Sequence, residues 1–130
     1  MQSNVALSKN LSFMAAIPLN KEQFEKRVAR IVPHSREFVF LGHRPAVIDF
    51  YAEWCGPCHM VAPMLDDLSK TYDGKVDFYK INVDEENELS GHFDIRSIPT
   101  LFLVTAKGEV RRFTGALSRD RLKQLVDELL

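Results

Sequence analysis

The stretch PAVIDFYAEWCGPCHM, residues 45–60, places an almost continuous apolar run directly before Cys55 and Cys58, the two cysteines of the chain. The run is rich in β-favouring residues and predicts a strand that is buried on both faces. Beyond Cys58, apolar residues recur at helical spacing and predict an amphipathic helix. The two cysteines therefore lie where a buried strand passes into a helix.

Two cysteines three residues apart are compatible with a metal centre, a haem attachment site, or a dithiol that opens and closes as a disulfide. A closed zinc site usually needs four ligands, and the chain has no second cysteine pair. The sequence CGPCH matches the haem-attachment pattern, with His59 as the axial ligand. However, the buried strand before it and the helix-entry Pro57 leave little room for a porphyrin. A purely structural disulfide is disfavoured because so short a loop stabilises the fold very little.

The size and charge of the chain indicate one globular domain. Its 130 residues suffice for a core without further cross-links. The 17 basic and 18 acidic residues nearly cancel and form no long blocks, which gives no support for a nucleic-acid partner or a membrane surface. No apolar stretch approaches the roughly 20 residues of a membrane span. We therefore expect a monomeric domain that neither binds nucleic acid nor spans a membrane.

The remaining pattern predicts alternating strands and helices over residues 20–130, after an N-terminal extension or tether of residues 1–19. Asn20 is a helix N-cap with Gln23 in capping-box spacing, and Pro33 ends that helix. The later elements are a strand over 75–84, a short helix over 85–93, a hairpin of 100–104 and 109–113 with Gly108 at the turn, and a helix over 118–130. The fold class is therefore α/β: a mixed central sheet of parallel strands plus a C-terminal antiparallel hairpin, with helices on both faces.

Cys55 and Cys58 lie just beyond the carboxyl end of the buried strand, where sheets of this kind place their functional crevice. If the helix begins near Gly56, Cys55 is at its N-terminus. Free N–H groups and the helix dipole favour a negative charge there, and they lower the pKa of a thiol from its free value of about 8.5. Pro57 suits the first turn of a helix. Cys58 lies one turn further in and is less exposed, so Cys55 is the predicted nucleophile.

Asp49 interrupts the apolar strand, and a carboxylate in such a position is unfavourable unless it is paired or partly neutral. One interpretation is a residue that faces solvent or lies at a strand irregularity. The other is a buried base behind the disulfide, with its pKa raised because desolvation disfavours the charged form. The residues alone leave both interpretations open.

Several separate motifs of the chain resemble the thioredoxin family. They occur in the family's order over roughly residues 20–130, and they are DFYAEWCGPC, APMLDDL, KINVD, IRSIPTLFL and FTGALS. The resemblance implies a thioredoxin fold and reversible dithiol–disulfide exchange with substrate proteins, and it argues against haem attachment and zinc binding. It also implies that no bound cofactor is needed, because the redox-active Cys55–Cys58 disulfide carries the electrons.

The resemblance also assigns roles to individual residues. It implies that Asp49 is the buried base that takes the proton from Cys58, and that Lys80 is the partner of this carboxylate. It implies that the Ile98–Pro99 peptide bond is cis. The substrate-binding rim that it implies is flat and apolar, and consists of Trp54, Gly56, Pro57, Ile98, Pro99 and Gly115.

Three positions depart from the commonest pattern of the family. Ser97 is often glycine there, and Thr114 is often a small apolar residue; both departures affect the expected substrate preference. His59 stands where the family more often carries lysine or arginine. One helical turn beyond Cys55, a charged imidazole is predicted to stabilise the thiolate and so to tune the redox potential. The alternative is a solvated surface histidine without effect.

The electrons are expected from a thioredoxin reductase or a membrane dithiol donor, and the Gly-Pro pair between the cysteines resembles reductants more than oxidants. The N-terminal extension exceeds what the fold needs, which favours a periplasmic protein with its signal removed; a cytoplasmic location is the alternative. A second functional hypothesis is a redox-silent interaction module that uses the same rim. An insulin-reduction assay separates such a module from an enzyme.

Overall fold

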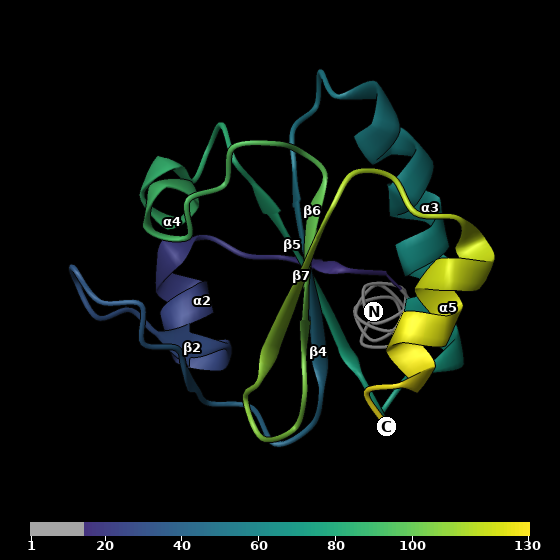
Figure 1. The fold of residues 1–130 in the computed structure, drawn as a ribbon, viewed down its shortest axis with the longest axis horizontal. Helices are drawn as coiled ribbons and strands as arrows, with labels where there is room; N and C mark the ends of the chain where they lie inside the picture. The colour runs from purple at the N-terminus through teal and green to yellow at the C-terminus, as the bar shows by residue number, and fades with distance from the viewer. Residues whose placement is uncertain (1–14) are drawn as a thin grey trace, which may run out of the picture.

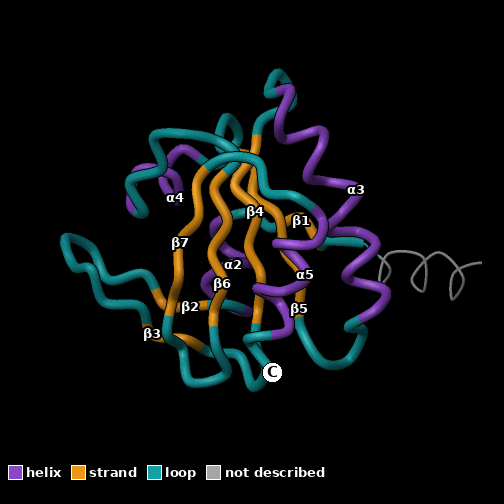
Figure 2. The backbone as a smooth tube through the Cα atoms, turned by 45° about the vertical axis from the view of Figure 1, so that its right-hand side comes forward, coloured by secondary structure: helices purple, strands orange, loops and turns teal. Residues whose placement is uncertain are grey.

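β4 (Ala46–Tyr51) lies at the centre of a five-stranded sheet with the strand order β1–β5–β4–β6–β7, in which β1 is Ile17–Pro18. The computed structural model describes residues 15–130. β4 runs parallel to β5 (Asp77–Asn82) and antiparallel to β6 (Thr100–Val104), which pairs antiparallel with β7 (Val110–Thr114). Figure 2 shows these strands side by side, with β7 at the edge. The predicted mixed sheet with a C-terminal antiparallel hairpin is confirmed.

Helices cover both faces of this sheet, as predicted (Figure 1). They are α2 (Lys21–Arg27) and α4 (Asn87–His92) on one face, and α3 (Gly56–Thr71) and α5 (Arg119–Asp127) on the other. Alternate side chains of β4 point to opposite faces: Ile48 and Phe50 pack with α2 and α4, whereas Val47 packs with α3 and α5. By the same alternation Asp49 lies on the α3 face. No helix within residues 15–130 has the length and hydropathy to cross a membrane.

The first helix is capped as predicted but ends earlier than predicted. The side chains of Asn20 and Gln23 each accept a hydrogen bond from the other residue's backbone N–H, which completes the capping box. α2 ends well before Pro33, because the chain continues into β2 (Ala29–Arg30), which pairs antiparallel with β3 (Val39–Phe40). Ala29 and Arg30 are themselves good helix formers, so the pairing with β3 and not local propensity holds this backbone extended.

A short strand at the N-terminal end was missed by the sequence pattern. β1 (Ile17–Pro18) pairs in parallel with β5, and its neighbours Ala16 and Leu19 are buried. The sheet therefore begins before the predicted domain boundary at residue 20. A strand of two residues has no periodicity that a sequence could reveal, and only its pairing with β5 defines it. The rest of the expected extension, residues 1–14, lies outside the described residues.

The C-terminal part of the fold agrees with the prediction. Gly108 adopts φ of +91° at the turn between β6 and β7, a conformation that favours glycine. The Ser118 side chain accepts a hydrogen bond from the Arg121 N–H and caps α5. The predicted inner faces of the two long helices are buried, namely Val61, Leu65 and Leu68 of α3 and Leu122, Leu125, Val126 and Leu129 at α5.

Candidate active site

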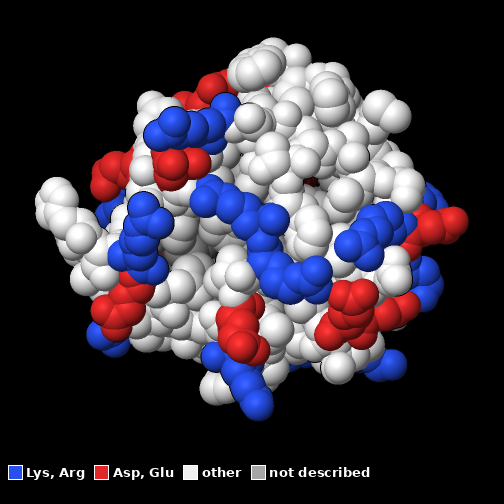
Figure 3. Space-filling view, in the orientation of Figure 1, with Lys and Arg blue, Asp and Glu red and all other residues white. Residues whose placement is uncertain are grey.

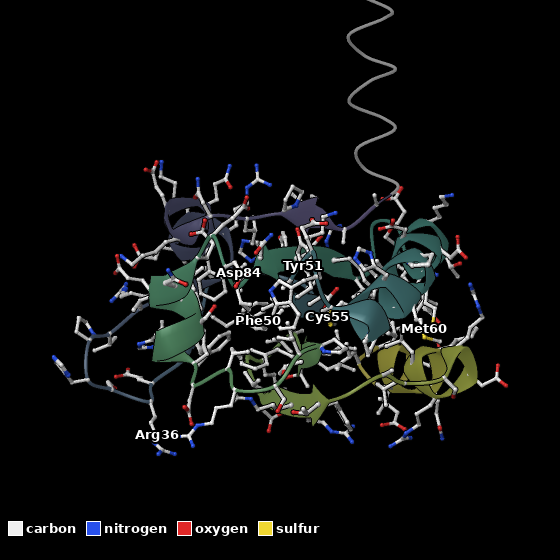
Figure 4. The ribbon with its side chains drawn as sticks, turned by 90° about the horizontal axis from the view of Figure 1, so that it is seen from above. Arg36, Phe50, Tyr51, Cys55, Met60 and Asp84 are labelled. Atoms are coloured by element: carbon white, nitrogen blue, oxygen red, sulfur yellow. A yellow bond between two sulfur atoms is a disulfide. The ribbon has the colours of Figure 1, made fainter. Side chains whose placement is uncertain are left out.

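Cys55 and Cys58 form a disulfide at the N-terminus of α3. Cys55 is the N-cap residue, and its Sγ accepts a hydrogen bond from the Cys58 N–H at 3.2 Å. An N–H group and the positive end of a helix dipole therefore point at the sulfur on which a thiolate would form. Figure 4 looks onto this end of the sheet and shows Cys55 where α3 begins.

Asp49 lies buried beneath the disulfide, on the face of β4 that α3 covers. It is 2% exposed, and its Oδ1 has no hydrogen-bond partner among residues 15–130. Burial raises the pKa of Asp49 to about 7; the nearby Asp66 carboxylate adds to the rise, and the charge of Lys80 opposes it. The interpretation of Asp49 as a solvent-facing strand residue is therefore excluded. Its carboxyl group can gain or lose a proton near neutral pH.

A cavity of about 150 Å³ connects the surroundings of Asp49 with Cys58. Its other lining residues are Tyr51, Ala52, Glu53, His59, Ala62 and Lys80. The cavity has polar groups on several sides and is large enough for a few water molecules. A proton can therefore pass between Cys58 and Asp49 through water without a direct contact between the two side chains.

Lys80 reaches this site from the neighbouring strand. It is the register partner of Asp49 across the β4–β5 ladder, so both side chains lie on the same face of the sheet. Its Nζ lies 5.8 Å from the centre of the Tyr51 ring. No ion pair within 4.0 Å joins Lys80 to Asp49 in the part of the chain that the structure describes. Lys80 therefore acts on the carboxylate as a charge at a distance.

The expected rim surrounds the disulfide on its exposed side. Trp54 is 73% exposed, and its indole N–H donates a hydrogen bond to Asp84 Oδ2 at 2.7 Å. The polar tip of the indole is thus satisfied, while its apolar faces stay open to a partner. Gly56 and Pro57 are exposed, and a Cβ at Gly56 would meet nothing within 4 Å. These exposed residues lie next to the disulfide, whose own cysteines are buried at 4% (Cys55) and 2% (Cys58) exposure.

The loop before β6 completes the rim. Half-buried Ile98 packs against the cluster that contains Cys55 and Cys58. The Ile98–Pro99 peptide bond is cis, as the family resemblance implied. The Pro99 carbonyl accepts a hydrogen bond of 2.8 Å from the Gly115 N–H, which fixes Gly115 beside the loop. The structure thus brings all six predicted rim residues to the same end of the sheet as the cysteines.

His59 was expected near Cys55, and its ring lines the cavity that Cys58 shares. Its Nε2 donates a hydrogen bond to the Glu53 backbone oxygen at 2.6 Å, and its ring lines the cavity beside Asp49 and Cys58. The ring is therefore held on the Cys58 side of the disulfide. Its predicted effect on the Cys55 thiolate stays a prediction.

Sequence reasoning missed four contributors to the site: Asp66, which acts on the pKa of Asp49, and Asp84, Tyr51 and Glu53. Asp84 follows the carboxyl end of β5, and the carboxyl ends of neighbouring parallel strands meet at the same edge of a sheet. This rule would have placed Asp84 near the cysteines. Tyr51 lies two residues beyond Asp49 and shares its face, which would have placed it on the cavity side. Within residues 15–130 no cluster of three or more His, Cys, Asp or Glu side chains could hold a metal ion.

Comparison with known proteins agrees with this geometry. The chain matches the family described as Thioredoxin over residues 15–128. The thioredoxin of Borreliella burgdorferi is 37% identical over 113 residues, which cover 87% of this chain and 96% of that protein. The thioredoxin of Haemophilus influenzae is 42% identical over 84 residues, which cover 65% of this chain and 78% of that protein.

A solved structure has the same fold. Chloroplastic thioredoxin z superimposes on the chain with a TM-score of 0.73 at 27% identity, and the match covers 88% of this chain and 94% of that chain. The family match and the Cys55–Cys58 disulfide at the start of α3 lead to one conclusion. The chain belongs to the thioredoxin family and is a thiol–disulfide oxidoreductase with a thioredoxin fold.

Proposed function

We propose that the protein works as a reductant of protein disulfides, with Cys55 as the nucleophile, Cys58 as the resolving thiol and Asp49 as the base. The observation that supports this most strongly is the unpartnered oxygen of Asp49, buried in a cavity that Cys58 also lines. A base is most effective when its pKa lies near the working pH. The pKa of Asp49, raised to about 7 by burial, meets this condition.

The reaction proceeds in two exchange steps. The Cys55 thiolate attacks one sulfur of the substrate disulfide, forms a mixed disulfide, and expels the other substrate sulfur as a thiolate. Asp49 then takes the proton of Cys58 through water. The Cys58 thiolate attacks the Cys55 sulfur, re-forms the Cys55–Cys58 bond, and releases the second substrate thiolate. Two electrons pass from the dithiol to the substrate, and Asp49 returns its proton to the solvent.

The other polar residues around the disulfide support this chemistry. The charge of Lys80 opposes the rise in the pKa of Asp49, so the carboxyl group can still ionise near neutral pH. The rim, with exposed Trp54 and half-buried Ile98, receives the substrate loop. A thioredoxin reductase or a membrane dithiol donor reduces the disulfide again. The periplasmic location expected from the N-terminal extension stays a prediction.

An insulin-reduction assay tests the proposal. The purified protein, supplied with dithiothreitol, is expected to accelerate precipitation of the insulin B chain, and the Cys55→Ser variant is expected to give only the rate without protein. Lack of acceleration by the wild type, under conditions where its disulfide is shown to be reduced, would favour an interaction module over a reductant. The midpoint potential against glutathione then gives the direction of electron flow, since about 30 mV corresponds to 1.4 kcal/mol.

A further inference from the structure

A groove begins beside the loop that carries the substrate rim. Two cavities of about 520 and 630 Å³ share the lining residues Ser35, Arg36, Gly91 and His92. They therefore form one continuous groove between the β2–β3 loop and the C-terminal end of α4. The smaller cavity is also lined by Arg96, which precedes the rim residue Ile98 by two positions. The groove and the rim are thus neighbours.

The part of the groove next to the rim is positively charged. Three arginines, Arg36, Arg96 and Arg112, line the smaller cavity, against one carboxylate, Asp94. Asp94 is already paired with Arg96 at 2.9 Å, so two positive charges remain. Figure 3 shows Lys and Arg side chains around a hollow on the face that carries β7.

The arginines differ in how they are held. The Arg112 guanidinium donates hydrogen bonds to the Phe93 and Asp94 carbonyl oxygens and is fixed against the loop before the rim. Arg36 is exposed and makes no hydrogen bond or ion pair with any of residues 15–130. It lies at the outer edge of the molecule, on the loop between β2 and β3 (Figure 4). Its charge is therefore available to a partner.

The opposite flank of the disulfide has the opposite charge. Glu53, Asp84 and Glu85 are exposed carboxylates: Glu53 precedes Trp54 in the chain, Asp84 is bonded to its indole, and Glu85 follows Asp84. An acidic peptide is thus repelled on the Trp54 side and attracted on the Arg96 side. This asymmetry favours one direction of a substrate chain across the rim.

We propose that the cationic groove of Arg36, Arg96 and Arg112 binds an acidic segment of the substrate protein while the substrate disulfide lies on the rim. The inference rests on the proposed reduction of protein disulfides and concerns which substrates are preferred. An extended chain covers roughly 3.3 Å per residue, so Asp or Glu about three to six residues from the substrate cysteine reaches the groove. Exposed charge pairs act mainly on encounter and orientation, so the effect is on KM and kcat/KM.

The test uses two substrates, each a pair of peptides joined by one disulfide. The two substrates are identical except that one (the Asp peptide) carries two Asp residues and the other (the Asn peptide) two Asn residues, about three to six positions from the cysteine. At low ionic strength the wild type is expected to reduce the Asp peptide with a kcat/KM about threefold to tenfold higher than the Asn peptide, as two exposed ion pairs permit. The preference is expected to fade in about 0.5 M salt, where the screening length is short.

Arg36→Glu is expected to abolish or reverse the preference and to leave reduction of the Asn peptide unchanged. Lys107→Glu makes the same charge change at an exposed position in the β6–β7 turn, at the other end of the sheet, and is expected to keep the preference. Equal kcat/KM for both peptides with the wild type would overturn the proposed role of the groove. Equal loss of the preference in the two variants would overturn it as well. If neither peptide were reduced, the proposed function itself would fail, which is a distinct result.

Discussion

The polar groups on the two sides of the disulfide differ in whether they are hydrogen-bonded. Beneath it, Asp49 is buried with an oxygen that has no partner in the described part of the chain, and burial raises its pKa to about 7. Above it, the polar tip of Trp54 is bonded to Asp84 while the ring is 73% exposed. The buried side leaves a proton acceptor unsatisfied, and the exposed side leaves apolar surface uncovered.

Both arrangements are unfavourable for the stability of the isolated domain, and each serves a different step. An unpartnered carboxyl group in a low-dielectric cavity is a stronger proton acceptor than one in water, which suits the resolving step. An uncovered aromatic ring gains free energy only when a partner covers it, which suits binding. Variants of the two sides should therefore separate chemistry from recognition.

The largest effect is expected from the cysteines themselves. Cys55→Ser should abolish reduction of substrates, whereas Cys58→Ser should form a mixed disulfide with substrate that does not resolve, because attack by Cys55 remains possible and release does not. Non-reducing gel electrophoresis with mass spectrometry detects the trapped complex. If Cys55→Ser trapped substrate as well as Cys58→Ser does, the two thiols would have exchanged roles.

Asp49→Asn should make the stability of the oxidised protein less dependent on pH. The pKa of Asp49 is raised from 3.8 to about 7 in the folded state, so the folded protein holds a proton that the unfolded chain releases between these values. The wild type should therefore lose stability relative to the variant as the pH rises from about 4 to about 7, by up to about 4 kcal/mol for a shift of this size. The difference should be constant above that range.

Urea unfolding of both oxidised proteins from about pH 3.5 to 8 measures this effect. A control substitution, Asp73→Asn, changes an exposed carboxylate away from the cavity and should follow the wild type. Parallel stability curves for Asp49→Asn and the wild type would show that Asp49 is solvated and not desolvated.

The same Asp49→Asn variant should slow the resolving step by about a hundredfold near pH 7, the lower end of what a positioned general base supplies. The first step, attack by Cys55, should change much less, because the Cys55 thiolate is stabilised by the start of α3. Rapid-mixing kinetics with a fluorescent disulfide peptide separates the two steps. Equal slowing of both would remove Asp49 from the resolving step.

On the exposed side, Trp54→Ala should raise the KM for a protein substrate by roughly fivefold, as expected for a contact aromatic, and leave kcat nearly unchanged. Leu130→Ala removes another exposed apolar side chain, 64% exposed at the C-terminus, and serves as the matched control. Steady-state kinetics with an oxidised protein substrate gives both constants. A fall in kcat without a change in KM would show that Trp54 contributes to the chemical step and not to substrate binding.

The smallest effect is expected from His59, which lies at the border between the two sides. A charged imidazole near a thiolate contributes roughly 0.3–1 kcal/mol in a partly exposed position. This corresponds to on the order of 10–20 mV in the reduction potential. His59→Gln should therefore lower the reduction potential slightly. Redox titration against glutathione measures the shift; identical potentials for the variant and the wild type would make His59 a plain surface residue.

Prediction from the sequence was most successful where the signals were local. The capping box at Asn20, the turn at Gly108 and the cap at Ser118 each depend on residues a few positions apart, and all three are confirmed. The end of the first helix was wrong because Ala29–Arg30 pairs with a strand that lies beyond a loop. β1 was missed for the same reason, since its hydrogen bonds come from β5.

Strand period, helix period and cysteine spacing are local properties, and they already place Cys55 and Cys58 at the start of a helix that follows a buried strand. The surroundings of the two cysteines, in contrast, depend on how distant segments pack. Burial in the fold is the main cause of the raised pKa of Asp49, and the indole of Trp54 is bonded by Asp84, which follows β5. The pKa and the exposed rim depend on solvent exclusion and on groups distant in the chain, and neither can be read from local sequence.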